Sequence, residues 1–188
     1  MTTPRMPPIA ENDLTEEQKA AAATFAEGRG YGVRGPFMPL LRSPEVMLRA
    51  KAMGDYLRFK SVLEPRLSEM AILVTARFWS QNYEWHAHRP LAEKGGLNPA
   101  IADAIADGRR PENMADDEAA LYDFSTELHV NRSVSDATYA RAKAHFGEQG
   151  IIDLTALNGY YTLIAMVLNV GRVPLPEGST PGMERFPK

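Results

Sequence analysis

The chain has 188 residues, of which 44% are hydrophobic and 24% are charged. These values are typical of one soluble domain with a sizeable core, and they exclude a wholly disordered chain. The 21 Lys and Arg residues against 24 Asp and Glu residues give a formal net charge of −3. Because such a chain lacks the positive field that attracts a phosphate backbone, we expect no nucleic-acid partner.

The sequence also lacks the signals of membrane insertion and of several cofactors. No apolar run approaches the roughly 18 residues of a membrane span, and the first residues have no secretory pattern, so we expect a cytoplasmic protein without a membrane partner. The absence of Cys excludes disulfides, thiolate metal sites and thiol nucleophiles. Neither a P-loop, nor a dinucleotide-binding glycine pattern, nor a GxSxG elbow is present, and we expect no cofactor.

Two Pro-rich segments flank the predicted domain. Residues 1–14 and 173–188 are rich in Pro and polar residues, which indicates an N-terminal arm and a C-terminal tail. We therefore place a single domain at residues 15–172.

Within this domain the apolar spacing is helical throughout. Thr15 and Gln18 form a capping-box pattern before a helix at 15–27, which ends in the glycine-rich loop 28–36. Ser43-Pro44 begins an amphipathic helix, and Pro65 begins a helix at 65–78 that is apolar on most sides.

The remaining helices are bounded by capping residues and glycines. They are expected at 83–94, 98–108, 116–128, 135–146 and 151–170. Since no stretch alternates with a period of two, the predicted fold class is all-α, a helical bundle. The helices at 65–78 and 151–170 are apolar on nearly all sides, which predicts burial in a homo-oligomer as well as in the core.

The densest set of reactive side chains is Glu84-Trp85-His86-Ala87-His88. Glu84 and His88 are four residues apart on one helix face, so they can form a hydrogen bond. A carboxylate and an imidazole in a partly dry place form a plausible proton-transfer pair. The alternative is an ordinary pair on a solvated helix surface.

Glu69 lies on the most apolar predicted helix, where a carboxylate requires a partner. The structural alternative is Arg66 or Arg77 at the helix margin, and the functional alternative is a relay to His88. We also expect a set of residues to bind an organic anion, although the aromatic ones could equally belong to the core. The set is Arg34, Arg77, Trp79, Tyr83 and Trp85.

A metal site is not predicted. Glu84 and His88 could supply two ligands, but no second pair at ligand spacing completes the sphere. His129 and His145 are isolated from other ligand-type residues, on helix faces that the sequence predicts to be polar.

Two segments carry a family resemblance. The run PRLSEMAILVTAR at 65–77, followed by NYEWHAH at 82–88 and AEKGGL at 92–97, resembles the carboxymuconolactone decarboxylase family. The resemblance extends over roughly 35–172. It implies an all-helical fold of the alkylhydroperoxidase D-like type, assembled into homo-oligomers such as trimers or hexamers.

The resemblance also separates two branches of the family. The peroxidase branch uses a CxxC pair, and here Gln81 and Glu84 stand at the two cysteine positions. Thiol peroxidase activity is therefore excluded. The other branch resembles cofactor-free decarboxylases of carboxylated lactones from aromatic catabolism, in which a Glu and a His matching Glu84 and His88 are expected at the site.

The candidate catalytic residues are accordingly Glu69, Glu84 and His88. In this reading His88 is the general acid, Glu84 orients it or carries a second proton, and Glu69 sets its tautomer. Two alternatives remain open: lactone hydrolysis or isomerisation by the same residues, and a helical binding or oligomerisation module without catalysis. Burial of Glu84 and His88 against a cavity favours an enzyme, whereas solvated side chains favour the module.

Overall fold

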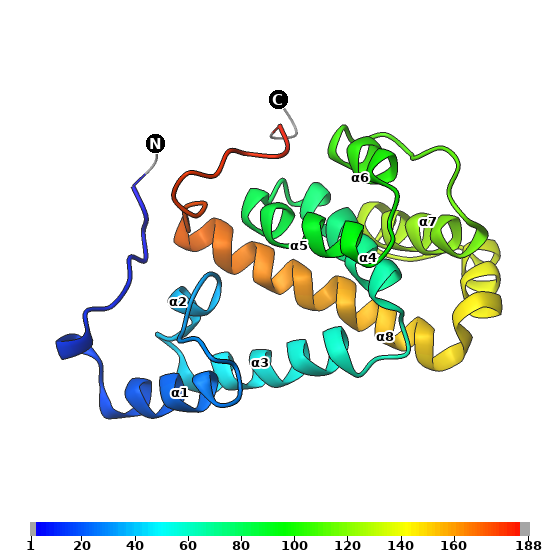
Figure 1. Cartoon of the computed structure of the whole chain (residues 1–188). Helices are drawn as coiled ribbons and strands as arrows, with labels where there is room; N and C mark the ends of the chain where they lie inside the picture. Colours follow the sequence, from blue (N-terminus) through cyan, green and yellow to red (C-terminus); the bar gives the residue numbers. More distant parts are fainter. Residues whose placement is uncertain (1–2, 185–188) are drawn as a thin grey trace.

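The computed structural model describes residues 3–184, and within this range it contains helices and no strand (Figure 1). The predicted all-α class is therefore confirmed. In chain order the elements are η1 (Glu11–Asp13), α1 (Glu16–Ala26), α2 (Phe37–Leu40), α3 (Pro44–Phe59), α4 (Pro65–Phe78), α5 (Asn82–Lys94), α6 (Pro99–Ala106), α7 (Asp116–Asn131) and α8 (Asp136–Gly171).

Most helices begin where the sequence signals them. Thr15 caps α1 in a reciprocal capping box with Gln18, and the Ser135 side chain accepts a hydrogen bond from the backbone of Thr138 at the start of α8. The two helices predicted at 135–146 and 151–170 are the two parts of α8, which are separated by the non-helical Gly147. The short elements η1 and α2 were not predicted, because three or four residues carry no helical period.

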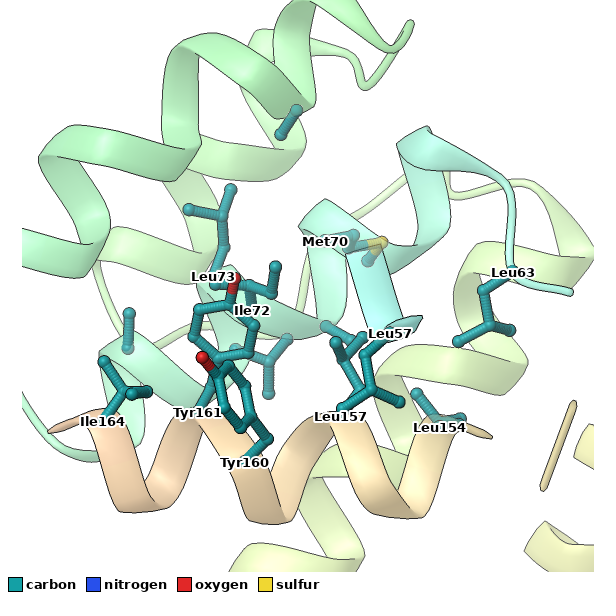
Figure 2. Close-up of a cluster of buried hydrophobic side chains, with 14 of the residues drawn as sticks. Leu57, Leu63, Met70, Ile72, Leu73, Leu154, Leu157, Tyr160, Tyr161 and Ile164 are labelled. Atoms are coloured by element: carbon teal, nitrogen blue, oxygen red, sulfur yellow. The ribbon is translucent and has the colours of Figure 1, made fainter. Parts of the chain in front are cut away.

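The core is organised around α8, which runs through the middle of the molecule with α4 and α5 on one side and α3 on the other (Figure 1). Figure 2 shows side chains from α3, α4 and α8 converging, among them Leu57, Leu73 and Leu157. On α4 every residue from Leu67 to Arg77 is buried, as the sequence predicted for a helix apolar on most sides.

The burial of α8 bears on the membrane prediction. By length and composition α8 could cross a membrane, so an 18-residue apolar window is present after all. The sequence expectation overlooked it because Asp153 and Asn158 interrupt the apolar run. Of that window 56% is buried inside the domain, which is the pattern of a core helix in a soluble protein.

Both predicted arms contact the domain. The backbone N–H groups of Arg5 and Met6 donate to the carbonyl of Gly171. At the other end Met183 and Asn82 exchange two hydrogen bonds, of 2.9 and 3.1 Å, which hold the tail over α5. The outermost residues of the predicted arms, 1–2 and 185–188, lie outside the described residues.

Candidate active site

A cavity of about 650 Å³ lies between α3, α5 and α8, beside the loop that joins α1 to α2. It contains side chains from both halves of the sequence, including Glu84, His88 and Tyr161. A volume of this size accommodates a small organic ligand. We therefore describe this cavity as the candidate active site.

A tight turn between α4 and α5 places the reactive groups. Ser80 adopts a left-handed conformation with φ of 49°, and the Gln81 side chain caps α5 by accepting from the backbone N–H of Tyr83 at 2.8 Å. The resulting hairpin brings Glu69 of α4 and His88 of α5 together. The predicted break at residues 80–82 is thus the feature that builds the site.

Of the two kinds of partner considered for Glu69, an arginine at the helix margin or His88, the structure shows the contact with His88. His88 Nδ1 lies 2.6 Å from Glu69 Oε2, and both side chains are buried. Arg66 instead binds Asp117 and Glu118. Since Nδ1 is engaged by Glu69, the carboxylate fixes the ring orientation and leaves Nε2 for a ligand.

The structure contradicts the prediction that Glu84 forms a hydrogen bond with His88. Glu84 makes no hydrogen bond to His88, and both of its carboxylate oxygens are buried without a partner. His88 is turned towards Glu69 on α4, which explains the missing bond. At 2% exposure Glu84 is not a surface group either, and its burial raises the pKa well above the ordinary value. Burial thus favours the protonated, neutral form of Glu84, which is one of the residues that line the cavity.

Aromatic side chains form one wall of the cavity. The ring of Tyr161 stands edge-on to His88 with 5.0 Å between centroids, and Tyr160 stands edge-on to Tyr161 at 5.2 Å. Gly54 of α3 is required for this packing, because a Cβ there would collide with the Tyr160 hydroxyl. Burial raises the pKa of both phenols, so both are neutral.

The mouth of the cavity is cationic. Arg29 and Lys51 share the carboxylate of Asp55, while the Arg34 guanidinium lies 3.6 Å from the centroid of the Tyr31 ring. The structure thus places Arg34 at the cavity, as the sequence predicted. Tyr83 also lines it, and burial raises the pKa of this phenol.

Three predicted ligand-binding residues do not line this cavity. Arg77 donates to the carbonyls of Ala106 and Glu184 on another side of α4. Trp79 donates to Thr162, and Trp85 is 1% exposed because it faces away from the cavity beneath the C-terminal tail. Arg77, Trp79 and Trp85 therefore lie outside this cavity, and a ligand-binding role for them stays a prediction; Trp85 belongs to the hydrophobic core.

Most of the charged lining residues missed by the sequence analysis come from α3. Lys51, Asp55 and Arg58 line the cavity at spacings of four and three residues. That spacing places three charges on one face of an amphipathic helix, which is the signal that could have identified them. Arg58 is the most informative, because its Nη2 lies 3.6 Å from Glu69 Oε1.

The histidines outside α5 have different environments. His129 is half-buried rather than on a polar face, with Nε2 at 3.0 Å from Thr75 Oγ1 and 3.1 Å from Asn158 Oδ1. His145 is exposed. Among residues 3–184 no group of three or more His, Asp or Glu side chains is arranged to hold a metal ion.

Comparisons with known proteins identify the fold. No model of a protein family matches the sequence, and no curated protein matches it. Several solved structures, in contrast, match the fold of the chain. An uncharacterized peroxidase-related protein from Ralstonia eutropha, described as an alkylhydroperoxidase AhpD core, aligns with a TM-score of 0.75 and 18% identity over 94% of each chain. The chain has the AhpD-like fold.

Two further structures share this fold. A peroxidase-related protein from Silicibacter aligns with a TM-score of 0.69 and 17% identity over 97% of this chain and 98% of its own. The debrominase Bmp8, solved as a cysteine-to-alanine variant with 2,3,4-tribromopyrrole, aligns with a TM-score of 0.70 and 10% identity over 94% of each chain. The AhpD-like fold therefore includes an enzyme whose ligand is a small ring.

Proposed function

We propose that this AhpD-like protein is a cofactor-free enzyme of the carboxymuconolactone decarboxylase type, acting on a small carboxylated lactone or a related organic acid. The observation that carries the proposal is the cavity that both Glu84 and His88 line, with His88 oriented by Glu69 and with burial favouring the neutral form of Glu84. Both side chains are buried, at 2% and 8% exposure, which favours an enzyme over a solvated binding module.

The reaction requires stabilisation of an enolate and delivery of one proton. Cleavage of the bond to the departing carboxylate releases CO₂ and moves its electron pair into the conjugated lactone carbonyl. A neutral Glu84 donates a hydrogen bond to the resulting enolate oxygen, a role that suits a carboxylic acid kept protonated by burial. His88 then transfers a proton to carbon and is reprotonated from water.

Each residue has a distinct part in this scheme. His88 and Glu84 are the candidate catalytic residues, whereas Glu69 is a positioning residue that acts through His88 Nδ1. The cationic side chains at the mouth, including Arg34, favour entry of an anionic substrate. Hydrolysis or isomerisation of a lactone by the same residues is the alternative.

The test is turnover of a carboxylated muconolactone, with released CO₂ and the product both quantified. Equal amounts of CO₂ and decarboxylated lactone are expected. Ring opening without CO₂ would instead identify a lactone hydrolase, and a rearranged lactone of unchanged mass would identify an isomerase. Binding without turnover of any lactone would favour the non-catalytic module.

We also propose a cytoplasmic homo-oligomer. Five large hydrophobic residues of α8 are exposed in the single chain, namely Tyr139, Ile152, Leu163, Met166 and Val170. Exposed apolar side chains on one long helix favour contact with another subunit. Light scattering should give a multiple of the 20.8 kDa chain mass, and a monomeric mass at all concentrations would contradict the proposal.

A further inference from the structure

A second cavity, of about 170 Å³, lies between α4, α6 and α7. Among the described residues it shares none of its lining with the candidate active site. Its walls are mostly apolar and include Val74, Ile105 and Val130. A cavity of about this size that is lined by apolar side chains can bind a single aromatic ring such as benzene. The second cavity therefore has room for one six-membered ring.

The imidazole of His129 gives this cavity a polar group whose proton can be assigned. His129 lines the cavity, and its Nε2 lies 3.1 Å from Asn158 Oδ1. Asn158 Nδ2 donates to the carbonyl of Leu154, which can only accept, so the amide oxygen is the atom that faces His129. Because this oxygen also only accepts, Nε2 carries the proton of the neutral ring and Nδ1 has a lone pair.

His129 Nδ1 is the acceptor that remains for a ligand. Within residues 3–184 it makes no hydrogen bond, and it is not one of the five buried side-chain atoms that lack a partner, so it retains accessible surface. Burial lowers the pKa of His129 despite the hydrogen bond with Asn158, so the ring is neutral at pH 7. Phe78 stacks on the ring with 4.9 Å between centroids. The acceptor is thus held in place before a ligand arrives.

The cationic side chain of the second cavity is already engaged by protein oxygens. Arg77 lines the cavity, and its guanidinium donates to the carbonyls of Ala106 and Glu184 and to the hydroxyl of Ser80. Its charge is therefore compensated within the protein, and the cavity favours a neutral ligand over an anion. Since one accessible acceptor stands among apolar walls, the matching ligand carries one hydrogen-bond donor.

We infer that the second cavity binds a small neutral phenol, whose ring packs against Val74, Ile105 and Phe78 and whose hydroxyl donates to His129 Nδ1. The proposed function assigns no role to this cavity, so the inference holds whether or not the protein is a decarboxylase. Toluene, which lacks the donor, and benzoate, which carries a charge, are the comparison compounds.

The experiment is an NMR titration of the full chain with phenol and with toluene at pH 7, after labelling of the imidazole nitrogens with ¹⁵N. The chain has four His residues, and a Gln variant of each assigns the signals. We expect His129 Nδ1 to give the signal of an unprotonated nitrogen, which phenol shifts as an accepted hydrogen bond does and toluene does not. Cross-relaxation from the phenol ring to the methyl groups of Val74 and Ile105 should locate the ring.

His129→Gln measures the contribution of the acceptor. The Gln amide can retain an N–H donor for Asn158 Oδ1, but it removes Nδ1. We expect phenol binding to weaken roughly three- to tenfold, which corresponds to the loss of one hydrogen bond, and toluene binding to change by less than about twofold. His145→Gln, which alters an exposed imidazole outside both cavities, is the matched control and should leave both affinities unchanged. Thermal unfolding checks that each variant is folded.

Several results would overturn the inference. A protonated Nδ1 in the free protein, or the absence of phenol binding, would remove the proposed acceptor or its ligand. Phenol affinity that falls in His88→Gln and not in His129→Gln would place phenol in the candidate active site instead. A larger response of the His129 signal to benzoate than to phenol would show that the cavity selects an anion through Arg77.

Discussion

Two buried polar clusters lie beside α4, and they differ in how completely their hydrogen bonds are satisfied. The first, the structural cluster, consists of Thr75, Ser125, His129 and Asn158. The second, the cavity cluster, consists of Arg58, Glu69, Glu84 and His88.

In the structural cluster the donors and acceptors of Asn158 are all used. Its Oδ1 lies 3.1 Å from both Thr75 Oγ1 and His129 Nε2, and its Nδ2 donates to Ser125 and to the carbonyl of Leu154. The cavity cluster leaves three buried atoms unpaired. The comparison indicates that completed networks hold the fold, while incomplete ones are available to a ligand.

The largest expected effect is on turnover in the cavity cluster. His88→Gln should lower kcat by about 10²–10⁴-fold, the range for a general acid, with little change in stability. Steady-state kinetics and thermal unfolding measure the two quantities. His145→Gln, which alters an exposed imidazole outside the cavity, is the control. Full activity in a folded His88→Gln protein would show that the cavity cluster needs no histidine.

The next effect is on stability in the structural cluster. Asn158→Ala leaves Thr75, Ser125 and His129 without their shared partner and should lower the free energy of unfolding by about 2–4 kcal/mol. Urea denaturation measures the loss, and Asn131→Ala at the exposed end of α7 should change stability little. A stable Asn158→Ala protein with reduced kcat would reverse the roles assigned to the two clusters.

A smaller expected effect concerns the pH dependence of stability, which distinguishes the cavity cluster from the structural cluster. Burial raises the pKa of Glu84, so the folded protein holds this proton more tightly than the unfolded chain does. The stability from this group is present below the unfolded pKa and is lost as the pH rises towards the folded pKa. Each unit of pKa difference corresponds to about 1.4 kcal/mol.

Glu84→Gln should therefore be more stable than the unaltered chain by more than about 1 kcal/mol at pH 8, with a smaller difference near pH 4. Urea denaturation at both pH values measures the two differences. Glu93→Gln, which alters a more exposed carboxylate on the same helix, should show no comparable gain. A difference that does not grow with pH would mean that Glu84 ionises normally in the cavity.

The smallest expected effect is that of metal removal. If the unpaired atoms of the cavity cluster serve a substrate and proton transfer, then chelation followed by dialysis should leave kcat unchanged. Activity on the same lactone before and after treatment measures this. Activity that is lost and then restored by a divalent ion would assign Glu84 and His88 to metal binding.

The sequence predicts the helices better than it predicts the site. Caps such as Thr15 and helix-starting prolines such as Pro65 act locally, so the sequence marks where α1 and α4 begin. The proximity of Glu69 to His88 was also predictable, because a short break joins the two helices that carry them. The catalytic roles of these residues stay predictions.

Contacts between distant segments were not predictable in the same way. Arg58 reaches Glu69 through the packing of α3, and the sequence does not state which helix packs there. The direction of a side chain was equally hidden, since Glu84 and His88 share a helix face but His88 is drawn towards α4. Arg77 and Trp85 were assigned to the cavity for their chemistry, whereas their contacts with the C-terminal tail depend on the tertiary fold.

The tail gives the protein an internal fluorescent reporter. Trp85 directly follows Glu84 in α5, and Gly182 lies so close that a Cβ there would come within 2.6 Å of the indole. One of the two tryptophans of the chain is therefore shielded from water by the C-terminal segment and adjoins a residue of the cavity. Departure of the tail from α5 would expose this indole to water, and we expect its contribution to the fluorescence to shift to longer wavelength.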